Sequence, residues 1–306
     1  MMPLRGASAE TRGILYMMMA VATLASMDAL AKLLSQHVDT LMVVWARYAG
    51  QTLLVMAVVA PRLRQVARTR YPGLQFLRSL LMLSATSFFF FGIARLGLAE
   101  STAIVDINPV LVTLGATLFL GERMGPRRAL GVLAGLVGAV IIIRPGGEVF
   151  SAAALLPLGA ALSFAGYALV TRFVGLDEDV WTSLLYSALF GTAVLSLGLP
   201  LFFSVPGPWA ILGLTAMGAL GTLGQMLLIR AYSAAEAGLV APFSYAGILV
   251  ATFWGVVLFG DFPDFWTIAG MVVIVGSGIY VWHREMKVAR RWAALKVRAD
   301  AEATQH

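Results

Sequence analysis

Residues 99–122 read AESTAIVDINPVLVTLGATLFLGE, and residues 235–261 read AEAGLVAPFSYAGILVATFWGVVLFGD. Both stretches open on Ala-Glu, carry a proline within an apolar run, and close on a glycine followed by an acidic residue. Further along, Gly131 corresponds to Gly270. The shared order of features extends over residues 92–146 and 230–283, so the sequence predicts two related halves.

The composition places these halves in a membrane. Of the 306 residues, 59% are hydrophobic and only 12% are charged, and the mean hydropathy is +0.85. A soluble domain has about 25% charged residues. Cysteine is absent, which excludes a disulfide framework and a thiolate metal site; no cofactor or metal is expected. The sequence pI is about 9.9, but the basic residues lie in short loops and a tail between apolar runs, so no nucleic-acid partner is expected.

Ten apolar segments are long enough to cross a bilayer, which takes roughly 20 residues. The connections between them are short and rich in proline and glycine, which leaves no room for a soluble domain. The predicted spans are 13–35, 41–60, 74–95, 98–120, 127–144, 151–173, 180–203, 209–233, 238–259 and 265–283.

The predicted organisation is an N-terminal tail (1–12), a first half (13–146), a second half (147–283) and a C-terminal tail (284–306). Each half holds five spans. Because five is odd, the second half enters the membrane upside down, and inverted repeats of this kind build alternating-access transporters around a central cavity. A cleaved signal peptide over residues 13–26 is disfavoured, since cleavage would remove part of the first half.

The basic residues predict the orientation. Most of the 22 Lys and Arg residues lie at the N-terminus, after even-numbered spans or in the C-terminal tail. The positive-inside rule then puts both termini in the cytoplasm, as for a bacterial-type inner-membrane protein. In the tail, Val288, Trp292, Leu295 and Ala299 recur at helical spacing between basic residues, which favours an amphipathic helix on the inner leaflet over a solvated tail.

Two predicted spans carry helix breakers at corresponding positions. Asn108-Pro109 interrupts the fourth span, and Pro242 interrupts the start of the ninth. A proline removes one backbone hydrogen bond and bends a helix. In a membrane the freed carbonyl needs a partner or a watery cavity. Both breaks are therefore expected either to line a substrate site or to serve as packing kinks.

These features together resemble the drug/metabolite transporter superfamily in its ten-helix form with two EamA-type halves. The resemblance covers about 13–283 and rests on the repeat, the Leu-Gly-Glu-Arg run at 120–123 with Gly131 and Gly135, and the series Asp28, Lys32 and Arg47. The second half departs mildly, with Asp261 in place of the usual Glu. The resemblance implies a ten-helix basket with a central cavity that transports small organic solutes such as amino acids, S-adenosylmethionine or riboflavin, with export as the default direction. Ten helices can form such a basket as a monomer, but the sequence does not show the oligomeric state.

Spans one and two carry the first candidate site residues. Asp28 and Lys32 stand four residues apart on one face, close enough to pair, and a charge at this depth is costly unless it is paired or hydrated. Trp45, Tyr48 and Gln51 share a face of span two, with Arg47 beside it. Arg47 has three readings: it binds a substrate carboxylate, pairs with Asp28, or reaches the outer interface.

Other spans add candidates of mixed chemistry. Asp106 precedes the break in span four, where a carboxyl group either couples transport to protons, as Asp28 also could, or is hydrated near the outer mouth. Two arginines near the cytoplasmic ends, Arg78 and Arg230, are interpreted as interface anchors. The remaining expected substrate-site residues are Phe88, Asn108, Tyr167, Gln225 and Tyr245.

The sequence distinguishes three classes of function for a membrane protein of this kind. A secondary transporter of small metabolites fits best, and no ATP-binding motif is present, so a gradient must drive any pumping. An intramembrane enzyme is disfavoured because His37, His283 and His306 are scattered and no metalloprotease motif occurs. A channel or a lipid-handling membrane protein is the third class. A channel would show rings of like charge or a filter loop, and the sequence has neither. Because the candidates carry both signs of charge and several aromatic rings, amino acids or related zwitterions are the favoured substrates, with lipid bilayer and possible coupling protons as the other partners.

Overall fold

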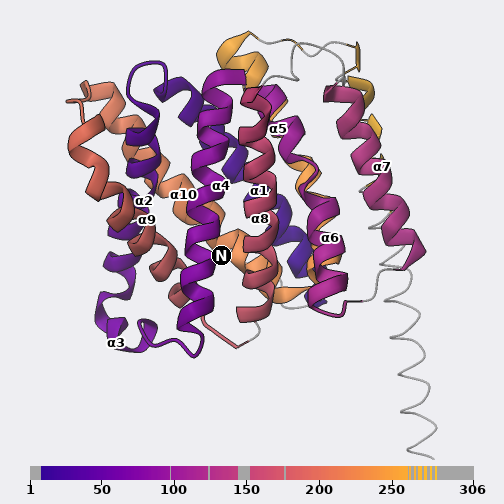
Figure 1. Ribbon diagram of the computed structural model, residues 1–306, viewed down its shortest axis with the longest axis horizontal. Helices are drawn as coiled ribbons and strands as arrows, with labels where there is room; N and C mark the ends of the chain where they lie inside the picture. Colours follow the sequence, from indigo (N-terminus) through magenta and orange to yellow (C-terminus); the bar gives the residue numbers. More distant parts are fainter. Residues whose placement is uncertain are drawn as a thin grey trace, which may run out of the picture.

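The computed structural model describes residues 8–96, 98–122, 125–143, 152–175 and 177–260, together with residue 262 and separate positions from 265 to 280. Within these ranges every regular element is helical (Figure 1). Seven helical segments of the described residues are long and apolar enough to cross a membrane, and shorter apolar helices accompany them. This confirms an all-helical membrane fold.

The first half begins with α1 (Ala9–Leu34) and α2 (Thr40–Val59), which η1 (Ala60–Arg62) and α3 (Leu63–Val66) extend. It continues with α4 (Pro72–Leu96), α5 (Leu98–Val105), α6 (Asn108–Phe119) and α7 (Pro126–Ile143). The second half holds α8 (Leu155–Val174), α9 (Val180–Phe202), α10 (Pro208–Ala234), α11 (Ala237–Val240), η3 (Ala241–Tyr245), α12 (Ala246–Trp254) and η4 (Gly255–Phe259). The predicted tenth span is described only at separate positions, and both predicted tails lie outside the described residues apart from Ser8 to Arg12.

Local chemistry repeats between the halves. Asp39 begins α2 and accepts a hydrogen bond from Leu41 N at 2.8 Å, and Asp179 begins α9 in the same way through Trp181 N at 3.4 Å. A side-chain acceptor at this position satisfies one of the free N–H groups of the first turn. The second helix of each half therefore begins with the same aspartate N-cap.

Both predicted breaks are confirmed. The fourth span divides into α5 and α6 at Asp106 and Ile107, with Pro109 in the first turn of α6. The corresponding span of the second half changes from α-helix to the 3-10 segment η3, with Pro242 in its first turn. Each broken span ends on a glycine in the left-handed region, Gly121 at φ +66° and Gly260 at φ +71°, a conformation that residues with a Cβ rarely adopt.

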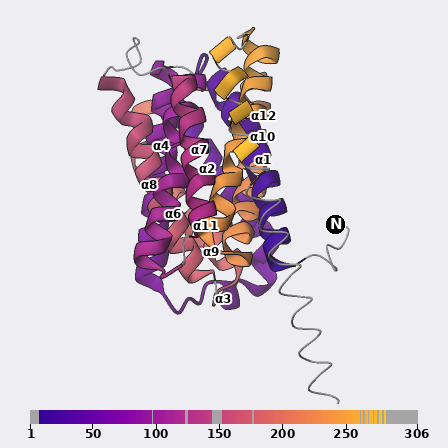
Figure 2. The same ribbon diagram turned by 90° about the vertical axis from the view of Figure 1, so that its right-hand side faces the viewer.

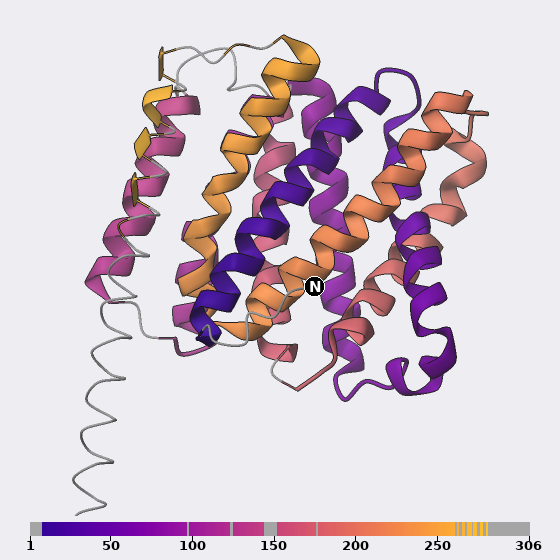
Figure 3. The same cartoon turned by 180° about the vertical axis from the view of Figure 1, so that it is seen from behind.

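The two halves run in opposite directions. The first turn of α1 lies against the end of α10, where a Cβ on Gly13 would meet Ala235, and the end of α8 reaches the same region, where a Cβ on Gly175 would meet Ser233. One end of the bundle therefore holds the start of α1 and the end of α8. Figure 3 shows α1 rising from this end beside α10.

The halves interlock rather than sit apart. Helix α1 packs along α10 and α12, α4 packs along α8, and α2 packs along α10 (Figure 2). The backbones of α2 and α10 approach closely, since a Cβ on Gly50 would lie 2.7 Å from the Cα of Gly218. Small residues allow this backbone contact in a membrane, where van der Waals packing holds helices together.

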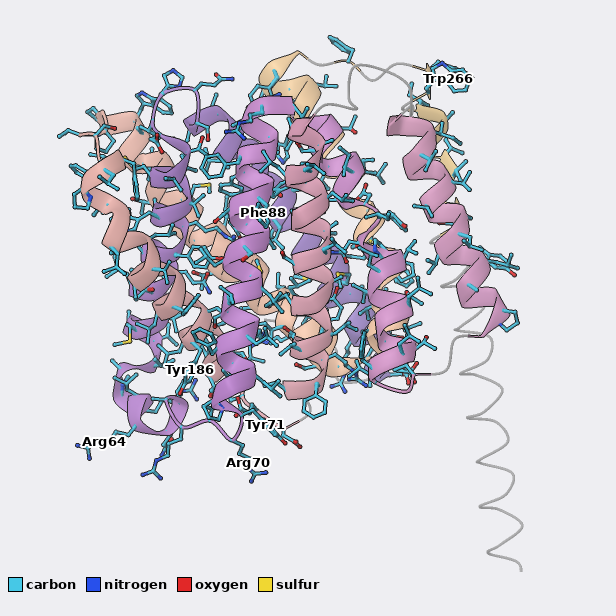
Figure 4. The ribbon with its side chains drawn as sticks, viewed as in Figure 1. Arg64, Arg70, Tyr71, Phe88, Tyr186 and Trp266 are labelled. Carbon is cyan, nitrogen blue, oxygen red and sulfur yellow. The ribbon has the colours of Figure 1, made fainter. Side chains whose placement is uncertain are left out.

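One end of the bundle carries the predicted cytoplasmic arginines, and we call it the basic end. It is formed by the α3 region and the loop that follows, with Arg62, Arg64, Arg68 and Arg70. Figure 4 shows Arg64, Arg70 and Tyr71 projecting from this end. The start of α4 lies here, and the start of α8 lies at the other end.

Candidate functional site

A cavity of about 170 Å³ lies among helices of both halves. It is displaced from the basic end, because its lining residues occupy the far part of each helix: 21–28 in α1, 82–90 in α4, and 160 and 164 in α8. Most of the wall is apolar, with the rings of Phe89, Phe90 and Phe164 among it. The polar lining residues are Asp28, Arg47, Thr86, Thr102, Asp106, Asn108 and Ser244.

Arg47 of α2 supplies the cation of this cavity. Only 2% of its surface is exposed, so its guanidinium does not reach the outer interface. Its Nη1 donates to Thr86 Oγ1, and its Nη2 donates to Gln225 Oε1 at 3.5 Å. Its Nε has no hydrogen-bond partner among the described residues. Arg47 is therefore held by neutral groups and keeps one donor unused.

A second layer of predicted residues supports this guanidinium. Gln225 Nε2 donates to Tyr167 OH, and the Tyr48 hydroxyl lies 3.2 Å from Thr86 Oγ1. All three of these side chains are at least 99% buried. On α10, Gly221 leaves room for the arginine stem, since a Cβ there would lie 3.2 Å from Arg47 Cγ.

The cavity also holds two carboxyl groups. Asp28 lines it from α1, and Arg47 is the charged group that acts on Asp28 electrostatically. Asp106 lines it from the α5–α6 break and is 8% exposed, and its Oδ2 has no partner among the described residues. Next to it, Asn108 donates to the carbonyl oxygen of Ala161 in α8 at 3.3 Å.

Eight predicted residues do not line the cavity. Three of them, Tyr48, Tyr167 and Gln225, form the second layer described above, and the other five lie elsewhere. The Lys32 ammonium lies 4.1 Å from the ring centroid of Phe259, so its described contact is with an aromatic face rather than the cavity. Trp45 donates to Ser196 Oγ of α9 at 3.0 Å. Gln51 is buried with its Nε2 unpartnered in the described part of the chain, and Tyr245 packs against Gly135. Phe88 is 41% exposed and points outward from α4 (Figure 4).

The cavity face of α4 was missed in the sequence. Its lining residues are Met82, Ala85, Thr86, Phe89 and Phe90, so Phe89 and Phe90 face the cavity in place of the expected Phe88. Four consecutive phenylalanines at 88–91 hide the period, because every face of that turn is aromatic. Thr86, a polar residue one turn before Phe90, was the signal that could have identified this face.

Arg78 corrects another prediction. It was interpreted as an interface anchor, but none of its surface is exposed. Its guanidinium donates to Thr171 Oγ1 at 2.8 Å, to the Ser183 carbonyl at 2.7 Å and to Tyr167 OH at 2.9 Å. Arg78 and Arg47 are thus linked through Tyr167 and Gln225. The sequence placed Arg78 only six residues into α4, and it could not show that α8 and α9 cover that turn.

The basic end is closed by contacts between the halves. Glu122, the acidic residue after Gly121, accepts hydrogen bonds from the backbone N–H groups of Ala237 and Gly238, both at 3.0 Å. Its carboxylate also pairs with Arg172 Nε at 3.3 Å. One carboxylate of the first half therefore holds the start of the broken span and the end of α8 in the second half.

A second contact closes the same end. Glu178 accepts from Arg70 N at 2.6 Å and from Gln75 Nε2 at 2.5 Å, and Thr69 donates to it as well. Nearby, the Tyr71 hydroxyl donates to Asp177 Oδ2 at 2.8 Å, and this hydrogen bond raises the pKa of the Tyr71 phenol. The loop after α3 is thereby tied to the loop between α8 and α9.

A helical membrane bundle with two related halves and a charged cavity between them is the architecture of a small-solute transporter. The model of the EamA-like transporter family matches residues 11–144 and 151–282, so the chain belongs to this family. It is a transporter rather than an enzyme.

Several characterised relatives resemble the chain over most of its length. A riboflavin transporter of Rhizobium johnstonii is 31% identical over 229 residues, 73% of this chain and 74% of that protein. The pseudopaline exporter CntI of Pseudomonas aeruginosa is 31% identical over 86% of this chain and 93% of its own. An S-adenosylmethionine uptake transporter of Rickettsia bellii is 25% identical over 90% and 94%. A crystal structure covering 88% of this chain and 96% of its own shares the fold, with a TM-score of 0.74 at 20% identity.

Proposed function

We propose that the protein is a secondary active transporter of small zwitterionic metabolites, with amino acids as the favoured substrates. The observation that carries this proposal is one cavity lined by Arg47 and by the carboxyl groups of Asp28 and Asp106. A guanidinium suits a substrate carboxylate, and a carboxylate suits an ammonium group. Substrate binds between the halves, and opening at alternate ends moves it across the membrane.

The size and walls of the cavity support an amino acid. Its volume of about 170 Å³ is below the roughly 300–1,000 Å³ of sites for drug-sized ligands. Phe89, Phe90 and Phe164 offer a surface for an apolar or flat side group. Riboflavin or S-adenosylmethionine is the alternative, supported by the names of the relatives and by the aromatic wall. Either of these larger molecules requires the cavity to widen.

The remaining parts of the proposal follow the sequence. Both termini lie in the cytoplasm, the membrane is a bacterial-type inner membrane with ten spans, and one chain forms a complete transporter. Protons drive the cycle through Asp106 or Asp28. Export is the direction that the family resemblance implies, and the relatives include both uptake transporters and an exporter.

Counterflow of labelled amino acids into proteoliposomes tests the proposal, with Arg47→Gln and Arg47→Lys beside the wild type. We expect saturable counterflow in the wild type. In Arg47→Gln the half-saturating concentration should rise about tenfold to a hundredfold, since a hydrogen bond to a charged group contributes about 1.5–3 kcal/mol. Arg47→Lys, which keeps the charge, should lose less. Thermal unfolding of each variant separates lost binding from lost folding. Counterflow that is unchanged in Arg47→Gln would contradict the proposal.

A further inference from the structure

The charges of the cavity do not balance. Its charged lining residues within the described part of the chain are Asp28, Arg47 and Asp106. The described wall therefore holds one guanidinium group and two carboxyl groups, and the guanidinium group acts electrostatically on Asp28. The second carboxyl group, Asp106, is left without a cation in the cavity wall. A buried charge in a membrane normally pairs with an opposite charge or faces a functional cavity.

The surroundings of Asp106 leave one of its oxygens available. The residue follows the last turn of α5, where its N–H donates to the Thr102 carbonyl at 2.9 Å, and α6 starts only at Asn108. Oδ2 is buried without a partner among the described residues. The titratable group that interacts with Asp106 from η3 is Tyr245, which carries no positive charge. Around the cavity, α4 and α8 contribute phenylalanine rings, and α12 contributes Gly247 and Ala251.

The aromatic part of the wall favours the same sign of charge. Phe89 and Phe90 from α4 and Phe164 from α8 line the cavity together with Asp106. The face of an aromatic ring attracts a cation, more strongly when water is excluded. A carboxylate and phenylalanine rings therefore make this part of the cavity suited to a positively charged group.

We infer that Asp106 binds a cationic group of the substrate, so that the transporter selects metabolites with a net positive charge over those with no net charge or a negative one. This deepens the proposed function and rests on it. The substrate carboxylate lies at Arg47, where Nε is unused, and the cationic group lies at Asp106. With Asp28, Arg47 and Asp106 all charged, a substrate with one net positive charge brings the total charge of the occupied cavity to zero.

The test is a competition series of similar-sized amino acids in the counterflow assay: lysine with net charge +1, methionine with 0 and glutamate with −1. We expect lysine to compete best, by about tenfold over methionine, and glutamate to compete least. Asp106→Asn should bring the lysine-to-methionine ratio near one, and this ratio, rather than the rate of counterflow, is the readout. Thr113→Val is the matched control, because Thr113 Oγ1 is also buried and unpartnered in the described residues but does not line the cavity. That variant should keep the wild-type ratio.

The outcomes distinguish the two claims. Counterflow with equal competition by lysine and methionine in the wild type overturns this inference and leaves the proposed function standing, and no counterflow with any amino acid overturns both. A lysine preference that survives in Asp106→Asn, with loss of the response to an imposed pH gradient, assigns Asp106 to proton coupling and overturns the subsite. If Asp106→Asn does not fold, Asp106→Glu replaces it, because this variant keeps the carboxylate and should retain the preference for lysine over methionine. Loss of that preference in Asp106→Glu, with counterflow intact, contradicts the inference.

Discussion

The basic end and the opposite half of the bundle are built differently. At the basic end, charged side chains join the two halves: Glu122 holds the start of α11 and Arg172, and Glu178 holds the loop after α3. Between these contacts and the cavity, residues such as Met17, Val112, Tyr167 and Tyr232 pack into a buried cluster. In the opposite half, the same helices surround a cavity of about 170 Å³.

This difference defines the conformational state of the molecule. Two carboxylates with several donors each close one end, and the cavity lies on the other side of the packed cluster. In an alternating-access cycle, the contacts at the closed end must break before substrate can leave there. The Gly-Glu element at residues 121–122, which by itself says nothing about substrate, takes part in this closure.

The largest effect is expected from Glu122→Ala, which removes the acceptor shared by Ala237 N, Gly238 N and Arg172. Hydrogen bonds to a charged group contribute about 1.5–3 kcal/mol each, so closure should weaken by about 3 kcal/mol, or roughly a hundredfold in population. The chain has no cysteine, so a cysteine introduced at Ala116, in the packed cluster, reports opening by its rate of labelling. Glu122→Gln keeps one oxygen acceptor and should show a smaller rise. An unchanged labelling rate in Glu122→Ala would contradict the claim that Glu122 closes the basic end.

A substitution between the two regions should affect stability instead. A Cβ on Gly218 would lie 2.6 Å from the Cα of Gly50, and neither backbone can move aside easily. Gly218→Ala should lower the free energy of unfolding by about 1–3 kcal/mol, the usual cost of overpacking, as measured by thermal unfolding in detergent. Gly73→Ala is the matched control, since nothing lies within 4 Å of its added Cβ. Equal stability of the two variants would contradict the close α2–α10 contact.

A smaller effect is expected from Glu178→Gln. Arg70 N and Gln75 Nε2 donate to different oxygens of Glu178. The variant keeps one of these two acceptors and loses the charge. Charge contacts near the surface contribute about 0–1 kcal/mol, so labelling at residue 116 should rise only a few-fold. A rise larger than that of Glu122→Ala would show that the loop contact, rather than the broken span, controls the basic end.

The smallest effect concerns pH. The hydrogen bond to Asp177 raises the pKa of the Tyr71 phenol, so this contact contributes stability below the unfolded-state pKa of about 10. The contribution is lost as pH rises through the raised folded-state value. Wild type should exceed Tyr71→Phe in melting temperature by a constant small amount from pH 7 to 9, and the difference should shrink as pH rises further above about 10. A difference that grows with pH would contradict the contact.

Much of the fold could be predicted because its signals are local or periodic. Apolar length predicted an all-helical membrane fold, and seven described helical segments are long and apolar enough to cross a membrane. Pro109 and Pro242 identified the breaks, since a proline acts on its own helix wherever that helix packs. Four residues were expected at the site because charged and amide groups in apolar spans are costly unless they are paired or functional. They are Asp28, Arg47, Asp106 and Asn108. All four line the cavity.

What escaped prediction depends on contacts between distant segments. Glu122 meets residues 237 and 238 only because α6 and α11 pack together, and the burial of Arg78 depends on α8 and α9 covering its turn. Phe88 and Phe89 differ by about 100° around one helix, and a run of identical residues carries no information about which of them faces inward. Such placements are decided by packing between the halves.

The most direct test of the account is the side from which the cavity can be reached. A single cysteine at Thr102, which lines the cavity from α5, should react with a membrane-impermeant maleimide added to the side opposite the basic end, and added substrate should slow the reaction. Under the same conditions, a cysteine at Ala116 should stay unreactive from both sides. Labelling of residue 102 only from the side of the basic end would contradict the account.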